Sequence, residues 1–484
     1  MQLNQGNKRP NILWICTDQQ RWDTLGCYGN SWVHTPNLDA LAANSAQFDF
    51  AFCQSPICTP SRSSFLSGRY PRTTRCRQNG QSIPADEILV TKMLADSGYH
   101  GGLAGKLHIS ACEPPICPME GEPRIDDGYA EFNWSHDHRP IWPANAYGNW
   151  LKQRGKTYQT PAISQSRYVQ AGMPEEDHQT TWCVEKASEF IWRRSCRTQP
   201  WFFSLNLFDP HHPFDPPAEY LKRYLDRLDE IPLPNFEKEQ LQDRPLWQQL
   251  DHQNAYNAKG SFPYPQMTDT DHRLVRAAYW AMIDLIDVQL GRLFQTLRDT
   301  GQWENTLIIF MSDHGEMLGD HGIYLKGPYC YEEAVRVPLL MHMPGQIKAG
   351  RRDQLVELTD LAPTLLDIAG MQPHPGMHGK SLMPVLTDAN QAHRDDVYCE
   401  YHNTLVSHRN PTAHVTMLRN TTHKLVVAHG QNTGELYDLT NDPKEQVNLW
   451  LDSEAQVVKM QMLERLCDRM AWTVDPLPQR LANW

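Results

Sequence analysis

A cysteine and an arginine four positions apart carry the clearest chemical signal in this chain. Residues 58–62 read Cys-Thr-Pro-Ser-Arg, and Gly68 follows a few residues later. Pro60 suits the first turn of a helix and Gly68 suits its end, so we predict a short helix with Cys58 at its positive end. An anion beside Cys58 would meet the helix amide groups and the Arg62 guanidinium together. Taken alone, such a cysteine is more often a buried, inert thiol, so the rest of the chain has to decide.

Polar side chains that can bind ligands or move protons follow four predicted core strands. In an open α/β sheet the carboxyl ends of the strands meet at one crevice, so we expect these side chains to be neighbours. Asp18 and Gln19 follow a strand at 11–16, Lys106 and His108 follow one at 99–105, Asp209, His211 and His212 follow one at 201–208, and Asp313 and His314 follow one at 306–311.

One subset of these residues has the chemistry of metal ligands. Asp18, Gln19 and Asp313 offer oxygen atoms, and His314 offers a nitrogen atom. Carboxylates with an amide suit Ca²⁺ or Mg²⁺, and the histidine extends the choice to Mn²⁺ or another transition ion. The alternative for Asp313 and His314 is a turn aspartate beside a surface histidine.

A second subset combines two lysines with two histidines: Lys106, His108, His211 and Lys326. Lysines can hold an anionic fragment, and histidines can move protons near neutral pH. A lone lysine is more often a solvated surface charge.

Two further patterns are weaker evidence for a functional site. We interpret residues 136–138, His-Asp-His, as a solvated loop, and Cys112 with Cys117 lacks the second pair of a zinc site.

Strands alternating with helices predict the fold class. The expected helices cover 35–46, 177–194 and 269–300, which gives an α/β fold with a large, mainly parallel sheet sandwiched by helices. Residues 114–174 lack periodicity and indicate long loops over the sheet ends. After residue 386 the pattern changes to a smaller α+β domain, so we predict domains at 1–386 and 387–484. Its expected elements are strands at 397–398, 415–418 and 424–427 and a helix at 453–470.

Composition excludes several classes of partner. The net charge is −12 and no basic run is present, which argues against nucleic acid but not against a small anionic substrate. No apolar run is long enough to span a membrane. The polar start of the chain shows no secretory signal, and its twelve cysteines lack framework spacing, so we predict a cytoplasmic protein.

With these residues in place, the chain resembles the type I, formylglycine-dependent sulfatases of the alkaline-phosphatase superfamily. The family signature, Cys-x-Pro-Ser-Arg followed by Thr-Gly-Arg, appears as residues 58–62 and as Ser67-Gly68-Arg69. The resemblance runs from residue 10 to about 450 and implies an alkaline-phosphatase-like sheet. Further matches are 11–18, Gly26-Cys27-Tyr28-Gly29, 35–39, Gly105-Lys106-Leu107-His108, 210–214, 312–315 and 437–439.

The resemblance implies that a maturation enzyme oxidises Cys58 to Cα-formylglycine, with Pro60 and Ser61 as part of its recognition signal. One hydroxyl of the aldehyde hydrate would attack sulfur, and the other would expel sulfate as the aldehyde re-forms. One divalent metal, Ca²⁺ before Mg²⁺ or Mn²⁺, would be held by Asp18, Gln19, modified Cys58, Asp313 and His314. Arg62 and Lys106 would stabilise the hydrate and sulfate, and His108 would act as base. His211 and Lys326 would bind sulfate and assist the leaving oxygen. Asn79 would contact the substrate.

Three functions follow from this resemblance. The first is removal of an O-sulfate group from a carbohydrate or other small alcohol. The second is hydrolysis of phosphonate monoesters or phosphodiesters, because such relatives share the Asp-Gln and Asp-His pairs where many sulfatases have Asp-Asp and Asp-Asn. Those relatives lack the Lys-x-His pair, so Lys106 and His108 favour the sulfatase. The third is an inactive sulfoglycan-binding protein with unmodified Cys58. Three tryptophans in the loop region are more often packing residues than sugar platforms: Trp134, Trp142 and Trp150.

Overall fold

The central element of the computed structural model is an eight-stranded sheet in the order β4-β3-β5-β1-β6-β7-β2-β8. Strands β3, β5, β1 and β6 are adjacent and parallel, whereas β7 runs antiparallel to both of its neighbours. The predicted, mainly parallel sheet is therefore confirmed. The structure describes residues 9–113, 121–139, 141–163, 166–404, 408–410 and 412–478. The strands are β1 Asn11–Thr17, β2 Ala46–Phe52, β3 His100–Gly105, β4 Glu131–Trp134, β5 Trp201–Asn206, β6 Thr306–Ser312, β7 Arg336–His342 and β8 Gly350–Glu357.

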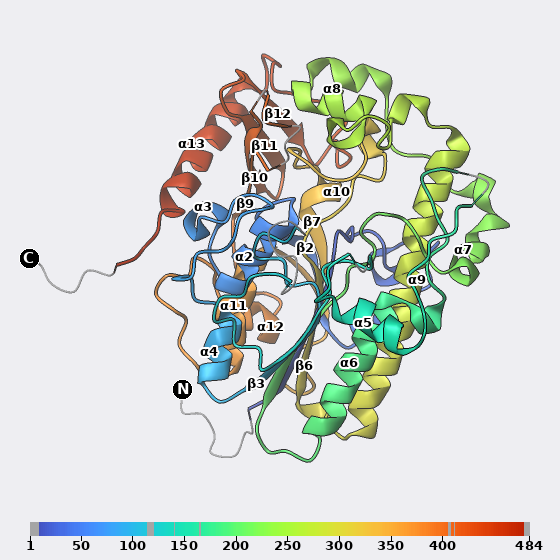
Figure 1. Cartoon of the computed structure of the whole chain (residues 1–484). Coiled ribbons are helices and arrows are strands. Elements are labelled where there is room, and N and C mark those ends of the chain that lie inside the picture. Colours follow the sequence, from blue (N-terminus) through green and yellow to red (C-terminus); the bar gives the residue numbers. More distant parts are fainter. Residues whose placement is uncertain are drawn as a thin grey trace, which may run out of the picture.

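Helices cover both faces of this sheet (Figure 1). Strand β1 shows why: Ile12 and Trp14 pack into one apolar core, while Leu13 and Ile15 pack into the other. A strand buried on both faces has to be a continuous apolar run, as its sequence is. One face carries α1 Pro36–Ala42, α5 Ala146–Gln153, α6 Gln179–Arg194, α7 Ala218–Leu225 and α9 Asp269–Asp299, and the other carries α2 Cys58–Ser67, α4 Val90–Asp96, α11 Leu361–Ile368 and α12 Met383–Thr387.

A second, four-stranded antiparallel sheet lies at the C-terminal end, with α13 Gln456–Trp472 packed on it (Figure 1). Its strands are β9 Asp396–His402, β10 His414–Asn420, β11 His423–Ala428 and β12 Thr433–Asp438. The expected C-terminal mixture of short strands and a helix is present, whereas a domain boundary at residue 386 stays a prediction. Short helices α3 Pro71–Thr74, α8 Leu246–Gln253 and α10 Glu332–Val335 complete the structure. Among the described residues, no helix is long and apolar enough to cross a membrane.

The sequence pattern did not predict every strand. Strand β7 contains Pro338, which argues against a strand inside a sheet because proline cannot donate to the ladder. The structure accommodates it opposite an irregularity in β2, where the register shifts between Phe48 and Ala51. The region 114–174 also holds more order than long loops, because β4 and α5 lie within it.

Candidate active site

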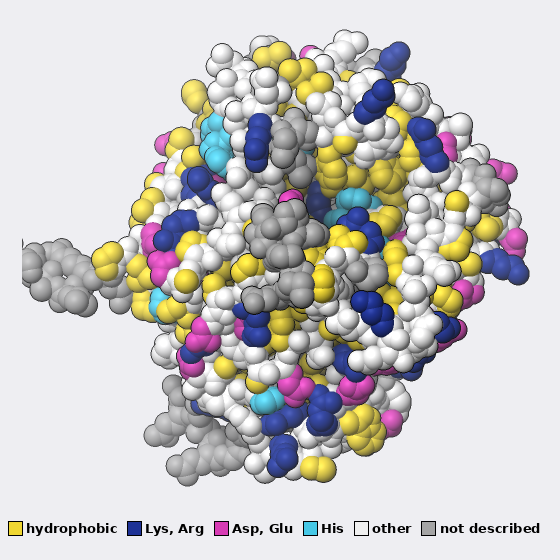
Figure 2. Space-filling model, in the orientation of Figure 1, with side chains coloured by type: hydrophobic (Ala, Val, Ile, Leu, Met, Phe, Trp, Pro, Cys, Tyr) yellow, Lys and Arg dark blue, Asp and Glu magenta, His cyan; other side chains and the backbone are white. Residues whose placement is uncertain are grey.

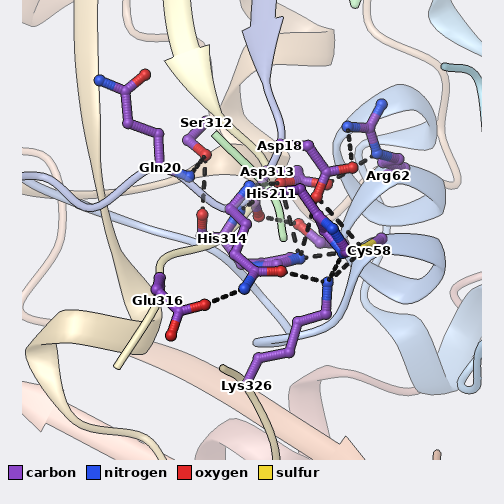
Figure 3. A network of polar contacts seen from close by, with 12 residues as sticks. Asp18, Gln20, Cys58, Arg62, His211, Ser312, Asp313, His314, Glu316 and Lys326 are labelled. Atoms are coloured by element: carbon purple, nitrogen blue, oxygen red, sulfur yellow. Dashed lines mark hydrogen bonds and ion pairs between the residues drawn. The ribbon is translucent and has the colours of Figure 1, made fainter. Parts of the chain in front are cut away.

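The four adjacent parallel strands bring their polar ends together, as expected. Asp18 follows β1 and donates its amide to the Asp209 carbonyl after β5 at 3.3 Å, and Asp313 follows β6 and donates to the Thr17 carbonyl at 3.2 Å. Lys106 follows β3 and donates its amide to the Asn206 carbonyl at the end of β5. These links hold the strand ends at one edge of the sheet, where Figure 3 shows Asp18, Asp313, His211 and Cys58 gathered.

Helix α2 begins at Cys58 and ends at Gly68, whose φ of 69° is the left-handed conformation that favours glycine. The predicted helix is therefore confirmed. Cys58 is 1% exposed, at the helix end where backbone amides point outward. Asn79 accepts a hydrogen bond from the Thr59 amide at 3.0 Å, so it satisfies one of these amides while also lining the cavity described below. Ser61 donates to the Asp313 carbonyl at 2.6 Å and ties the helix to β6.

Arg62 joins three strand ends. Its Nε donates to Asp313 Oδ2 at 2.8 Å, its Nη2 to Asp18 Oδ2 at 3.3 Å, and its Nη1 to the Lys106 carbonyl at 2.8 Å. The side chain is buried, which alone would lower the pKa of Arg62, but the carboxylates of Asp313 and Asp18 raise that pKa above its ordinary value. The guanidinium therefore stays charged and neutralises two buried carboxylates.

Lys326 uses all three of its ammonium hydrogens within the site. It donates to Cys58 Sγ at 3.0 Å, to Gln19 Oε1 at 2.7 Å and to His211 Nε2 at 2.9 Å. Since His211 Nδ1 faces the His212 carbonyl at 2.5 Å, we assign the proton to Nδ1 and the lone pair to Nε2. Burial and the Lys326 charge hold the pKa of His211 well below its ordinary value, which agrees with a neutral ring.

Lys106 places a second ammonium beside the cysteine. Its Nζ lies 2.5 Å from Asp18 Oδ2 and 3.7 Å from Cys58 Sγ. Burial and the Asp18 carboxylate raise the pKa of Cys58, but Lys106, Lys326 and His314 outweigh them and lower that pKa to about 7. Cys58 is therefore in the electropositive setting of a reactive cysteine and not in that of an inert core thiol.

The donor set at the strand ends fits one divalent cation. Ligand atoms of Asp18, Cys58, Asp313 and His314 all lie within 4.8 Å of one another, and all four residues are buried. His314 Nε2 is 3.2 Å from Cys58 Sγ, 3.9 Å from Asp18 Oδ1 and 3.8 Å from Asp313 Oδ1. Ligands around one hard cation are spaced by about 3 Å or slightly more, so the cluster needs little adjustment. His314 Nδ1 faces the Gly315 carbonyl at 2.9 Å, which directs the Nε2 lone pair into the cluster.

His108 lies in the same cavity as Cys58, but its position depends on a residue that the sequence did not reveal. The amides of His108, Ile109 and Ser110 donate to the Glu122 carboxylate at 2.7, 2.5 and 2.9 Å. Trp134 Nε1 adds a fourth donor at 3.2 Å. His108 has a φ of 54°, an uncommon value for a residue with a side chain. Glu122 therefore holds the 108–110 backbone in a strained turn.

Replacing Glu122 by alanine is expected to lower kcat about 10- to 100-fold, because a shift of about 1 Å in a reacting group is enough for such a loss. KM should change less, since the cations around Cys58 are untouched. Steady-state kinetics with an aryl sulfate, the substrate class that the resemblance implies, together with a melting curve, measures both effects. Trp134→Phe is the matched control, because it removes one of the four donors and leaves the carboxylate. A folded Glu122→Ala variant with unchanged kcat would contradict the positioning role.

A cavity of about 750 Å³ opens onto Cys58 and is lined by residues from distant parts of the chain. Figure 2 shows a hollow on this face, with histidine and basic side chains at its floor and hydrophobic side chains along one wall. Predicted residues of its lining are Cys58, Asn79, Lys106, His108, His211 and Lys326. The sequence analysis did not select Arg139, Tyr256 and Arg409, which also line it. Tyr256 has a φ of 58°, a strained backbone that could not be read from residue type.

The interpretation of residues 136–138 as a solvated loop is wrong. Asp137 and His138 are each 2% exposed, and His136 lines the cavity with its ring centroid 4.5 Å from that of His108. Asp137 accepts hydrogen bonds from Arg139, which compensate for the burial of its carboxylate, and His138 stacks on Tyr158.

The packing interpretation of the three tryptophans agrees with their contacts. Trp134 packs edge-on against Trp142 with ring centroids 5.9 Å apart, and Trp150 stacks on Tyr147. Trp142 also lines the cavity. Cys112 lines the cavity as well. Cys117, the other cysteine considered for a zinc site, lies outside the described residues.

A mainly parallel sheet that gathers a buried cysteine, a donor set that fits a divalent cation and three cationic side chains at one edge has the architecture of a hydrolase of the alkaline-phosphatase superfamily. Within that class the chain belongs to the sulfatase family, because the Sulfatase family model matches residues 10–371. A second model, N-sulphoglucosamine sulphohydrolase C-terminal, matches residues 319–471.

Relatives whose names differ in the reaction they indicate resemble this chain. An arylsulfatase of Clostridium perfringens is 29% identical over 479 residues, which cover 95% of this chain and 93% of the relative. The multifunctional alkaline phosphatase superfamily protein PehA of Trinickia caryophylli is 30% identical over 427 residues, covering 81% and 80%. The crystal structure of a phosphonate monoester hydrolase of Agrobacterium radiobacter superposes with a TM-score of 0.83, with 27% identity and 98% coverage of both chains.

Proposed function

We propose that this protein hydrolyses an O-sulfate ester of a carbohydrate or other small alcohol. The observation that carries the proposal is the convergence of Lys106 and Lys326 on Cys58, beside a buried donor set that fits a divalent cation and whose carboxylates are paired with Arg62. A sulfate group at this point would meet these cations at the buried floor of the cavity, where electrostatic stabilisation is stronger than in bulk water.

We further propose that a maturation enzyme converts Cys58 to Cα-formylglycine. The hydrated aldehyde supplies an oxygen nucleophile at this position and a second hydroxyl through which sulfate can leave. Arg62 and Lys106 would hold the sulfate oxygens, and His108 would accept the hydrate proton. Burial and the Lys106 charge hold the pKa of His108 well below its ordinary value, so the ring is neutral and able to accept a proton. His211 and Lys326 would hold the leaving oxygen, and Asn79 would contact the substrate.

The cation would be held by Asp18, Gln19, Asp313, His314 and the modified Cys58. It would supply positive charge to the sulfate oxygens. We propose Ca²⁺ because carboxylate and amide oxygens dominate the set, with Mg²⁺ and Mn²⁺ as alternatives to be compared directly. We further propose a cytoplasmic location, because the cysteines of the sequence lack the spacing of a disulfide framework.

A second candidate function is hydrolysis of phosphonate monoesters. It is supported by the likeness to the Agrobacterium enzyme at 27% identity and by the relation to PehA at 30%. Sulfate and phosphonate monoesters are both tetrahedral anions, so the same cations can stabilise either transition state. Lys106 and His108 remain the residues that favour the sulfatase. The intact cation and ligand sets argue against an inactive sulfoglycan-binding protein.

Parallel assays decide between the two reactions. The kcat/KM for an aryl sulfate is expected to exceed that for the matching aryl phosphonate monoester by about tenfold or more. Lys106→Ala should lower sulfate hydrolysis by about 10²- to 10³-fold, the cost of removing one transition-state donor. Lys348→Ala, which changes a lysine outside the cavity lining, is the matched control. A clear preference of the mature protein for the phosphonate would overturn the sulfatase proposal in favour of the second candidate.

A further inference from the structure

The Gln19 side chain is fixed at both ends. Its Oε1 accepts a hydrogen bond from the Lys326 ammonium at 2.7 Å, and its Nε2 donates to Glu316 Oε2. Glu316 and Arg62 lie on opposite sides of the cluster in Figure 3. Gln19 has a φ of 67°, and its amide donates to Asp313 Oδ1 at 3.0 Å, so the backbone is held as firmly as the side chain.

Glu316 is a buried carboxylate whose two oxygens accept hydrogen bonds from different groups. Oε1 accepts the amides of Leu318 at 2.9 Å and Leu325 at 2.5 Å. Oε2 accepts Gln19 Nε2. Within the described part of the chain, Glu316 makes no ion pair with a lysine or arginine, although its exposure is 0%. A glutamine would satisfy the two backbone amides equally well, so they do not explain why a costly buried carboxylate stands here.

The carboxylate determines which end of the Gln19 side-chain amide faces the cluster. The oxygen and nitrogen ends of an amide have nearly the same shape, and only their partners decide which way it points. A carboxylate can only accept, so it must face Nε2, and Oε1 must then face Lys326 and the cluster. With a glutamine at position 316, its NH₂ group would face Gln19 Nε2, which is also a donor. Gln19 could then turn its side-chain amide so that its nitrogen, and not its oxygen, faces the cation.

We infer that Glu316 is a positioning residue that makes Gln19 an oxygen ligand. This inference rests on the proposed function, because it requires the divalent cation that the function needs. The inference also makes a prediction for the exchanged pair. The hydrogen bond between positions 19 and 316 needs a donor on one side chain and an acceptor on the other, and either position can supply the donor. A glutamate at 19 facing a glutamine at 316 would re-form the hydrogen bond and still present an oxygen to the cation.

Calorimetric titration of metal-free protein with Ca²⁺ and with Mn²⁺ tests this requirement, with the metal-induced rise in melting temperature as a second measurement. Glu316→Gln is expected to weaken binding about 10- to 100-fold, the range for loss of a residue that orients a ligand. The double variant Gln19→Glu/Glu316→Gln is expected to bind at least as tightly as the unmodified pair. Glu333→Gln is the matched control, because this neighbouring carboxylate lies by His321 instead of Gln19.

Two outcomes overturn the inference. One is a folded Glu316→Gln variant that binds both cations as the starting protein does, and the other is a double variant that binds as weakly as Glu316→Gln alone. Melting curves without metal show that each variant is folded. If the starting protein binds no divalent cation at all, the metal of the proposed function fails as well. If it binds metal and cleaves sulfate while Glu316→Gln leaves the metal affinity unchanged, only the positioning role fails.

Discussion

Cys58→Ala is expected to reduce turnover of an aryl sulfate by at least about four orders of magnitude, as loss of a nucleophile does in other hydrolases. The thiol carbon is the only position at which the aldehyde hydrate of the proposed mechanism can form. The other proposed ligands, Asp18, Gln19, Asp313 and His314, are unchanged, so the variant should still bind Ca²⁺ in a calorimetric titration. Loss of turnover with retained cation binding would separate the nucleophile from the fold.

Cys58→Ser gives the sharper version of this test. A serine oxygen can attack sulfur and release the alcohol, but the sulfate ester it forms has no second hydroxyl to expel sulfate. We expect at most one equivalent of alcohol per protein in a rapid burst, and almost no turnover after it. Continued turnover by the serine variant at the rate of the mature protein would contradict the hydrate mechanism.

Mass spectrometry supplies the control for both variants. The tryptic peptide that contains Cys58 and ends at Arg62 should lose one sulfur and two hydrogens and gain one oxygen when the chain is produced with a maturation enzyme. Chain produced without that enzyme should keep the thiol, fold and bind metal, and show almost no activity. Full activity from a preparation in which every Cys58 keeps its sulfur would remove formylglycine from the proposal.

The gathering of polar residues at the strand ends could be predicted because it depends on local sequence and on one rule of topology. The runs 12–16 and 307–311, at the centres of β1 and β6, are continuously apolar, which identifies strands buried on both faces. Parallel neighbours then place the residues that follow them at the same edge. This argument needed no knowledge of strand order, although β3, β5, β1 and β6 proved to be adjacent.

The supporting residues could not be predicted, because their roles depend on contacts that sequence does not encode locally. Glu122 and Glu316 carry no motif, and each acquires its importance from the amides that point at it in the folded chain. Part of the cavity wall was equally hard to predict, because Tyr256 and Arg409 come from segments that do not directly follow the central strands. The burial of Asp137 and His138 could not be predicted from a polar tripeptide, because it depends on contacts with Arg139 and Tyr158 in the folded chain.

Arg62→Ala is expected to have the second-largest effect, and it should act on stability as well as on catalysis. Removing the guanidinium leaves the carboxylates of Asp18 and Asp313 buried with Lys106 as the nearest remaining cation. Breaking a buried ion pair from one side typically costs about 3–5 kcal/mol of the free energy of unfolding. Loss of one cation from the sulfate site should also reduce kcat/KM about 10²- to 10³-fold.

The same charge argument predicts how a cation changes this result. A divalent ion bound between Asp18 and Asp313 would neutralise the carboxylates that Arg62 no longer faces, so Ca²⁺ should raise the unfolding free energy of Arg62→Ala more than that of the starting protein. Arg62→Lys is the matched control, because it keeps the charge but cannot reach both carboxylates and the Lys106 carbonyl at once. Urea unfolding with and without Ca²⁺, together with kcat/KM, measures these effects. If the lysine variant matches the starting protein in both, the planar fork of Arg62 has no special role and its charge alone is sufficient.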